Sequence, residues 1–489
     1  DGMSKEPHNA ISGVAGWFGT LASTVANTAN TVVDKIDEVA HLSDNNDSGG
    51  AVQPPEPETV GRIARKRSEH EQCAYEIKAR TTTNPALLQW ILGRQYPIIG
   101  TDFFFMALRD ESKLRELQEH RRRVGLEDRI FFSIDEELLY FPFCADFGPL
   151  NIGCVYRFIQ MLNEKLAKYP REGKSVVLVT TAKPETRTNA ATLIGCYLVL
   201  EKGLTAEEAW APFEFENACP FLTFRDASFD TETYHLLPID VLRGMYKAKE
   251  HKIIDLSKFD QELFDYLDDP NNADMHEIMP NKFVAFKGPK MVTKFHEDIG
   301  LMDLAPDKYV DALRRLNVSA VVRLNEPCYD EEDFKKEDFA HYDIYFDDCS
   351  TPDEAVLNKW FDACRAEKHA LAVHCKAGLG RTGTLICCWL MRKYQFTGAE
   401  VIGFIRVMRP GSILGEQQGF LSENEEYMWS LGDPDLPPIY PDGDCVVHDE
   451  YVDPAELERA KELAARRALE NTEAMNRQAA ERVAAQKGK

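Results

Sequence analysis

One ten-residue segment combines a cysteine, an arginine and glycines at a spacing that can bind and transfer a phosphoryl group. It reads His374-Cys375-Lys376-Ala377-Gly378-Leu379-Gly380-Arg381-Thr382-Gly383. Gly378 and Gly380 allow backbone angles that turn successive N–H groups inward, and such a ring of N–H groups binds anions. The same field favours the thiolate of Cys375, and the guanidinium of Arg381 can hold two phosphate oxygens. The pattern predicts a phosphatase that forms a phosphocysteine intermediate, with Cys375 as the nucleophile.

The other residues of this segment have supporting roles in the predicted chemistry. The phosphate-binding loop would consist of Lys376, Ala377, Gly378, Leu379 and Gly380. Thr382 can donate its hydroxyl to the sulfur when the intermediate breaks down, and His374 can orient the loop from behind. The alternative is a buried cysteine that happens to precede an arginine-bearing loop, which leaves the combined spacing of cysteine, glycines, arginine and threonine unexplained. The chemistry requires no metal ion and no organic cofactor.

A proton donor and a water-positioning residue complete the predicted reaction. An alkoxide leaving group needs a proton, and Asp348 is the best candidate donor because it follows a predicted strand in a turn-forming loop. Asp347 is the neighbouring rival, and a solvated turn acid is the alternative without function. Gln417 or Gln418 can position the water that attacks the phosphocysteine, although paired glutamines are also common on protein surfaces.

Two α/β regions are expected to carry these residues. The apolar run Ala370–Val373 enters the cysteine loop and the helical run Thr384–Tyr394 follows it, which is a strand, a loop and a helix. Further strands are expected at Arg129–Ile134, Ser175–Thr181, Phe283–Phe286, Ala320–Leu324, Tyr342–Phe346 and Ala370–His374. Further helices are expected at Leu150–Tyr169, Asn189–Leu204, Asp307–Leu316 and Glu354–Arg365. This alternation predicts the α/β class, with central sheets flanked by helices.

The length of 489 residues predicts two compact domains with appendages. We expect an N-terminal segment and linker at 1–60, a first domain at 61–250, an acidic linker helix at 251–280, a second domain at 281–432 and a C-terminal linker and charged helix at 433–489. The terminal extensions are expected to be helical or disordered. Residues 11–42 have an amphipathic pattern with a Ser, Thr and Asn face, which is typical either of a helix that contacts curved membranes or of a helix that docks on a partner protein.

Composition restricts the partners and the compartment. The formal net charge is −24, from 81 acidic and 57 basic residues, which argues against nucleic acid and favours a basic peptide partner. The 12 cysteines show no paired metal spacing and several lie in apolar segments, which indicates a reducing compartment. No secretory signal and no apolar run of membrane-spanning length is evident. We therefore expect a soluble, cytoplasmic protein, with the nucleus, the centrosome or basal body, or a curved membrane surface as further locations. The sequence does not predict an oligomeric state.

The chain resembles the cell-division-cycle fourteen family of dual-specificity phosphatases, the mitotic-exit phosphatases. Beyond the cysteine loop, the similarity is carried by five segments between about residues 99 and 431: Phe132–Leu138, Ala145–Asn151, Phe224–Ser228, Val321–Asn325 and Arg409–Ser412. The resemblance implies two tandem phosphatase-like domains, of which only the second is catalytic. The stretch Ala182–Arg187 of the first domain has no cysteine, so this domain is expected to supply substrate-binding surface.

The resemblance also implies a substrate class. Family members read a proline after the phosphoserine and a basic residue further on through an acidic groove, and the matching carboxylates here are Asp265, Asp268 and Asp274. Without the resemblance, these acids would be interpreted as a solvated linker face. Cys349 stands where the family usually has glycine, which suggests the hypothesis of a reversible disulfide with Cys375 after oxidation.

The expected activity is therefore hydrolysis of phosphoserine, phosphothreonine and phosphotyrosine in proteins, in cell-cycle or ciliary and cytoskeletal regulation. Two alternatives come from other classes. A phosphoinositide phosphatase has a similar loop but tends to line its pocket with extra lysines, whereas this loop has Leu379 between its glycines. Anionic inositol phosphates would also be repelled by the carboxylates of the acidic groove. A phosphoprotein-binding scaffold would not need Cys375, Arg381 and Asp348 together.

Overall fold

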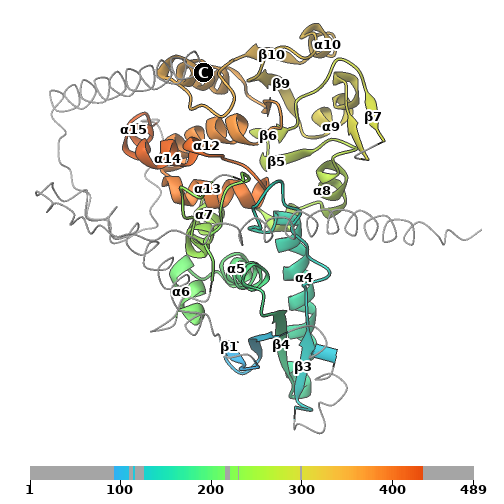
Figure 1. Ribbon diagram of the computed structural model, residues 1–489, viewed down its shortest axis with the longest axis vertical. Helices are drawn as coiled ribbons and strands as arrows, with labels where there is room; N and C mark the ends of the chain where they lie inside the picture. The colour runs from blue at the N-terminus through green and yellow to red at the C-terminus, as the bar shows by residue number, and fades with distance from the viewer. Residues whose placement is uncertain are drawn as a thin grey trace, which may run out of the picture. The chain divides into compact units, whose positions relative to one another are not determined.

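A computed structural model of the chain describes residues 93–109, 114–115, 126–214, 221–229, 231–297 and 300–432 (Figure 1). The expectations for residues 1–60 and 433–489, including the amphipathic segment at 11–42, lie outside these ranges. Within them, the structure contains two separate sheets with helices packed against each, and a short hairpin. The α/β class expected from the sequence is confirmed. None of the helices in these ranges is long and apolar enough to cross a membrane.

The first sheet has four strands in the order β1-β2-β4-β3. Its strands are β1 Tyr96–Ile99, β2 Phe103–Leu108, β3 Arg129–Phe132 and β4 Ser175–Thr181, and only the β1 and β2 pair is antiparallel. The helices of this region are α4 Ile152–Lys168, α5 Pro184–Leu200, α6 Ala206–Trp210 and α7 Pro238–Glu250. Strand β4 is buried along almost its whole length, as expected for a parallel strand covered on both faces.

The second sheet has five strands in the order β10-β9-β11-β6-β5. They are β5 Met275–Met279, β6 Phe283–Phe286, β9 Val318–Arg323, β10 Ala340–Asp343 and β11 Ala370–His374, all parallel except β5. The hairpin is β7 Lys294–His296 with β8 Leu301–Asp303. The helices of this region are α8 Gln261–Asp268, α9 Val310–Arg315, α10 Glu332–Lys335, α11 Glu354–Ala366, α12 Gly380–Tyr394, α13 Gly398–Met408, α14 Glu416–Glu423 and α15 Glu425–Ser430. Strand β11 is fully buried at the centre, and it carries Cys375 to the edge where parallel strands end.

Two sequence expectations need correction. Residues 275–279, which we placed in the acidic linker helix, form β5 and pair with β6, while the helix of that segment is α8. The reason is that Met275 and Ile278 are both buried in the strand, each in a different hydrophobic cluster, whereas a helix there would leave β6 as an unpaired edge. The strand expected at Tyr342–Phe346 ends at Asp343, because the chain leaves the sheet to form the loop that carries Asp347 and Asp348.

Helices α7 and α13 connect the two regions through unusually close packing (Figure 1). A Cβ atom on Gly244 of α7 would lie 2.2 Å from the carbonyl oxygen of Glu400, and one on Gly403 of α13 would lie 2.7 Å from Cα of Val241. The two backbones therefore approach one another only because both positions lack a side chain. Beside this contact, Lys247 donates to the carboxylate of Glu400 at 2.8 Å.

Replacing Gly244 with alanine should destabilise the protein, because the new methyl group meets rigid backbone rather than a flexible side chain. We expect a loss of about 1–3 kcal/mol in the free energy of unfolding, measured by chemical denaturation. Gly419→Ala in α14 is the matched control: its Cβ would have its nearest neighbour at 4.0 Å, so helix propensity should leave stability unchanged or raised by up to about 1 kcal/mol. Equal effects of the two substitutions would show that α7 and α13 are not packed through Gly244.

Candidate active site

The cysteine loop lies between the C-terminal end of β11 and the first turn of α12. Strand β11 is hydrogen-bonded to β9 and β6 on its two sides, so the position from which the loop starts is rigid. Cys375 and Arg381 are both buried, with 3% and 1% of their surface exposed. Helix α12 begins at Gly380 and points its N-terminus into the loop, and an anion at a helix N-terminus is stabilised by the helix dipole.

Four consecutive carbonyl groups of the loop are held by donors outside it. The carbonyl of Cys375 lies 3.0 Å from Nδ1 of His374, and the carbonyl of Lys376 accepts from the N–H of Gly288 at 3.2 Å. Arg409 supplies the remaining donors, to the carbonyl of Gly378 at 2.7 Å and that of Ala377 at 3.0 Å. Because carbonyl and N–H groups point in opposite directions along such a loop, these contacts leave the N–H groups facing inward, as an oxyanion requires.

Gly378 shows why the loop needs glycine. Its φ of +72° lies in the left-handed region, which side chains with a Cβ disfavour. A Cβ there would also lie 2.0 Å from the carbonyl oxygen of Phe286 in the neighbouring strand. The loop therefore packs directly on the backbone of β6.

Arg381 and Asp348 meet at the mouth of the loop. Nη2 of Arg381 lies 3.0 Å from Oδ1 of Asp348, and Nη1 donates to the carbonyl of Phe346 at 2.9 Å. Asp348 is 57% exposed, whereas the arginine side chain is buried, so the carboxylate covers the guanidinium from the solvent side. Asp347 instead accepts from the hydroxyl of Tyr345 at 2.8 Å. Between the two rival acids, the geometry favours Asp348.

Thr382, Gln417 and Gln418 are all buried, but they face different surroundings. The hydroxyl of Thr382 has no hydrogen-bond partner among the described residues. Gln417 donates from Nε2 to the carbonyl of Ser350 in the Asp348 loop at 3.0 Å, and its Oε1 would lie 2.8 Å from a Cβ on Gly380. The Oε1 atom of Gln418 accepts from Arg406 at 2.8 Å, away from the cysteine loop. Gln417 is thus the glutamine that contacts both loops of the site.

A chain of hydrogen bonds supports the cysteine loop through His374. The sequence indicates His374 but not its partners Tyr329 and His341. His374 lies with Nε2 2.7 Å from the hydroxyl of Tyr329, and the same hydroxyl lies 2.9 Å from Nε2 of His341. Burial lowers the pKa of His374 to about 3, and burial also raises the pKa of Tyr329, so the imidazole stays neutral and the phenol stays protonated. No motif marks Tyr329 or His341, because they meet His374 only through the pairing of β9, β10 and β11.

The three candidate substrate carboxylates have different partners. Asp265 pairs with Arg157 of α4, and Asp268 accepts from Nε2 of His276 at 2.7 Å. Burial opposes the ionisation of Asp268, but the hydrogen bond from His276, with the nearby charge of Arg409, outweighs it and lowers the pKa of this carboxyl. Asp274 lies 2.9 Å from Nη2 of Arg409. A continuous path of contacts therefore runs from Asp268 through His276 and Arg409 to the cysteine loop.

Cys349 is exposed and has a φ of +59°, a conformation that glycine adopts without strain. Partial burial and the charge of Asp348 raise the pKa of its thiol. The hypothesis of a disulfide with Cys375 stays a prediction.

Two family models match the chain. "Dual specificity protein phosphatase, N-terminal half" matches residues 97–248, and "Dual specificity phosphatase, catalytic domain" matches residues 305–428. The first range contains the four-stranded sheet except Tyr96, the first residue of β1, and the second contains Cys375, Arg381 and Asp348. The expected fold of two tandem dual-specificity-phosphatase-like domains, with the cysteine loop in the second, is confirmed.

Curated relatives match both halves together. Dual specificity protein phosphatase CDC14A of Mus musculus is 44% identical over 303 residues, which are 62% of this chain and 50% of that protein. Dual specificity protein phosphatase CDC14C of Homo sapiens is 37% identical over 303 residues, or 62% of this chain and 67% of that protein. Tyrosine-protein phosphatase CDC14 homolog of Schizosaccharomyces pombe is 35% identical over 341 residues, or 68% of this chain and 61% of that protein. The chain spans about half the length of the mouse relative.

His374 should make stability depend on pH. An unfolded histidine takes up a proton near pH 6.5, whereas folded His374 stays neutral down to a pH of about 3. The unfolded state therefore binds the extra proton, and the stabilisation present above pH 6.5 is lost by up to about 1.4 kcal/mol per pH unit as the pH falls. Urea unfolding of the wild type and His374→Gln from pH 7.5 to 4.5 should show their stability difference shrinking toward acid. The exposed His369→Gln variant is the control, and a difference for His374→Gln that stays constant with pH would contradict the assignment.

Proposed function

The chain belongs to the CDC14 family of dual-specificity phosphatases, and from this premise we propose that it hydrolyses phosphorylated serine, threonine and tyrosine side chains of proteins. The observation that carries the proposal is the contact between Arg381 and Asp348 at the mouth of the cysteine loop. It brings a phosphate-binding guanidinium, a carboxyl that can transfer a proton and the nucleophile's loop to one place.

In the first half of the reaction, the phosphate takes the position that the inward N–H groups and Arg381 define. The Cys375 thiolate attacks phosphorus, an S–P bond forms, and the P–O bond to the substrate side chain breaks. Asp348, in its protonated form, gives its proton to the departing oxygen. Two oxygens of the phosphate can accept the hydrogen bonds of the Arg381 guanidinium. The carboxyl of Asp348 is then released from Arg381 and can turn toward the leaving group.

In the second half, water attacks the phosphocysteine. Asp348 now accepts the proton of that water, and the S–P bond breaks to give inorganic phosphate and the Cys375 thiolate. Gln417 is placed to orient the water because it contacts Gly380 and the Asp348 loop together. The unpartnered hydroxyl of Thr382 is available to donate to the sulfur as its negative charge returns.

We further propose that Asp265, Asp268 and Asp274 favour substrates with proline after phosphoserine and a basic residue downstream. This preference follows from the family resemblance. It is supported by the position of the three acids on α8 and the segment that leads to β5, and by the contact of Asp274 with Arg409, which itself holds the cysteine loop. Regulation of the cell cycle or of the cytoskeleton is the setting we propose for this activity.

Substitution at Cys375 and Asp348 tests the chemistry. Cys375→Ser should abolish phosphate release from a phosphoserine-Pro-x-Lys peptide. Asp348→Asn should lower kcat by about 10²–10⁴-fold on this peptide, because the alkoxide needs a proton, and by much less on an aryl phosphate with a good leaving group. Asp347→Asn is the matched control and should stay near wild type.

Equal losses for Asp347→Asn and Asp348→Asn would remove Asp348 as the proton donor. Turnover of a soluble phosphoinositide in preference to every peptide would replace the proposal with a phosphoinositide phosphatase. Peptide binding without any turnover that depends on Cys375 would indicate a scaffold.

The proposed groove predicts a change in selectivity rather than in chemistry. Asp265→Asn should reduce the ratio of kcat/KM between the phosphoserine-Pro-x-Lys peptide and its Gln counterpart by about 2–6-fold, the size expected for an exposed charge pair of about 0.5–1 kcal/mol. Glu262→Gln removes another exposed acid of α8 and should leave the ratio unchanged. An unchanged ratio in Asp265→Asn, with activity retained, would reject Asp265 as the lysine-reading acid while leaving the phosphatase assignment intact.

A further inference from the structure

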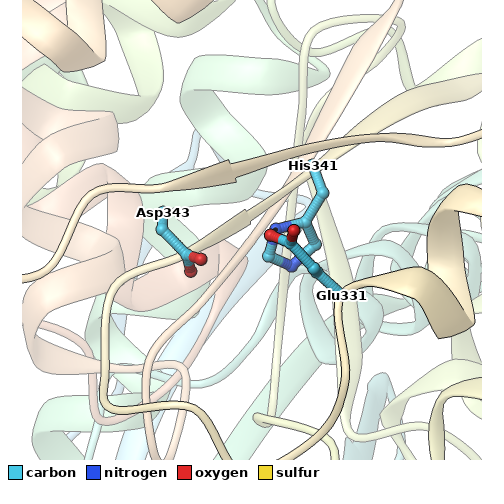
Figure 2. Close-up of side chains that lie close together, drawn as sticks. All are labelled: Glu331, His341 and Asp343. Atoms are coloured by element: carbon cyan, nitrogen blue, oxygen red, sulfur yellow. Dashed lines mark ion pairs between the residues drawn. The ribbon is translucent and has the colours of Figure 1, made fainter.

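Three side chains with metal-binding atoms gather beside β10, outside the proposed catalytic residues. They are Glu331, which immediately precedes α10, and His341 and Asp343 on β10, and their ligand atoms all lie within 4.8 Å of one another. The two carboxylates and the imidazole ring point toward a common space (Figure 2). Carboxylates near one another are common on protein surfaces, and the histidine is the residue that distinguishes this cluster from them.

The proton on His341 is determined by the chain of hydrogen bonds that begins at the cysteine loop. The carbonyl of Cys375 can only accept, so Nδ1 of His374 carries a proton and its Nε2 presents a lone pair. The hydroxyl of Tyr329 therefore donates its single proton to His374, and its oxygen accepts from Nε2–H of His341. Since a neutral imidazole carries one proton, Nδ1 of His341 is left with a lone pair.

Among the residues that the structure describes, this lone pair has no hydrogen-bond partner, although the side chain of His341 is 0% exposed. It faces Oε2 of Glu331 at 3.6 Å, with the carboxylate of Asp343 completing the cluster. A lone pair that faces two carboxylates is repelled by them, and a buried polar atom without a partner costs free energy. A cation placed between the three groups removes both penalties.

We propose that Glu331, His341 and Asp343 form a binding site for a first-row divalent cation of the zinc class. One imidazole nitrogen and two carboxylate oxygens suit Zn²⁺ better than Mg²⁺ or Ca²⁺, which prefer oxygen ligands alone. The 3.6 Å separation of Nδ1 and the Glu331 oxygen is close to the roughly 3.3 Å edge of a tetrahedron with bonds of about 2.0–2.1 Å. Water would fill the remaining position.

The side chains of Arg323 and Lys335 contact these two carboxylates and hold them in place. Arg323 donates from Nε and Nη2 to the two oxygens of Asp343 at 2.6 and 2.8 Å, and Lys335 contacts the other oxygen of Glu331. Each carboxylate oxygen has a second lone pair for the metal. Such outer contacts orient the ligands in metal sites.

The test is isothermal titration of the full-length Cys375→Ser protein with Zn²⁺ under reducing conditions, so that the reactive thiol is absent. Wild-type residues at the cluster should bind one Zn²⁺, and Glu331→Gln should weaken binding at least about tenfold, since loss of outer-sphere partners alone costs about 10–100-fold. The matched control is Glu332→Gln, which removes the adjacent acid and should bind as before. Mg²⁺ at the same concentration should not compete.

Cobalt(II) gives a second measurement that does not depend on the stability of a variant. Co²⁺ bound at this site should show visible d–d absorption without the near-ultraviolet band of a cobalt–thiolate bond, and Zn²⁺ should displace it. Absence of Zn²⁺ binding, binding unaffected by Glu331→Gln, or a thiolate band that disappears with Zn²⁺ would each overturn the proposal. In the last case the metal would be bound by cysteine instead.

Discussion

The rest of the site depends on the hydrogen bonds that the guanidinium of Arg409 donates. This one buried group donates to the carbonyls of Ala377 and Gly378, to the backbone and side chain of Asp274, and to His276. A loop that turns its N–H groups toward an anion must turn its carbonyls away, and those carbonyls cannot remain unsatisfied inside a protein. Arg409 donates to two of the four loop carbonyls, and its positive charge also attracts an anion bound in the loop. The shape of the cysteine loop and the position of the acidic segment thus depend on the same side chain.

The remaining two carbonyls are held by groups of a different kind. Gly288 supplies a backbone donor, while His374 supplies an imidazole that is itself held by Tyr329 and, through it, by His341. Backbone donors cannot titrate, and His374 is buried deeply enough to remain neutral, so the support of the loop is insensitive to proton uptake over the physiological range. The part of the site most exposed to solvent is instead the loop that carries Asp348, the proposed proton donor.

The cysteine loop and its strand can be found in the sequence because their signals are local. The order of Cys375, the glycines and Arg381 lies within one segment, and β4, β6 and β11 have the bounds expected from their apolar runs. What it missed depends on contacts between distant segments. Arg409 follows α13, Tyr329 follows β9, and both reach the cysteine loop only after the sheet has formed. The different surroundings of Gln417 and Gln418 also required coordinates, since neighbouring residues of a helix point about 100° apart. Similarly, β5 was hidden in an acidic segment because its pairing partner, β6, determines its conformation.

Helix α13 carries two contacts that are usually found on separate elements. Its middle, at Gly403, is pressed against α7 of the first half, and the residue that follows its end is Arg409. Less than about two turns of helix thus separate the contact with α7 at Gly403 from Arg409, which holds the cysteine loop. A truncated protein made of the second half alone would leave α13 without the surface that sets its position, and Arg409 would shift with it. The first half therefore supports the position of α13 and, through it, of Arg409, and a gene fragment cut between the two halves would lose that support.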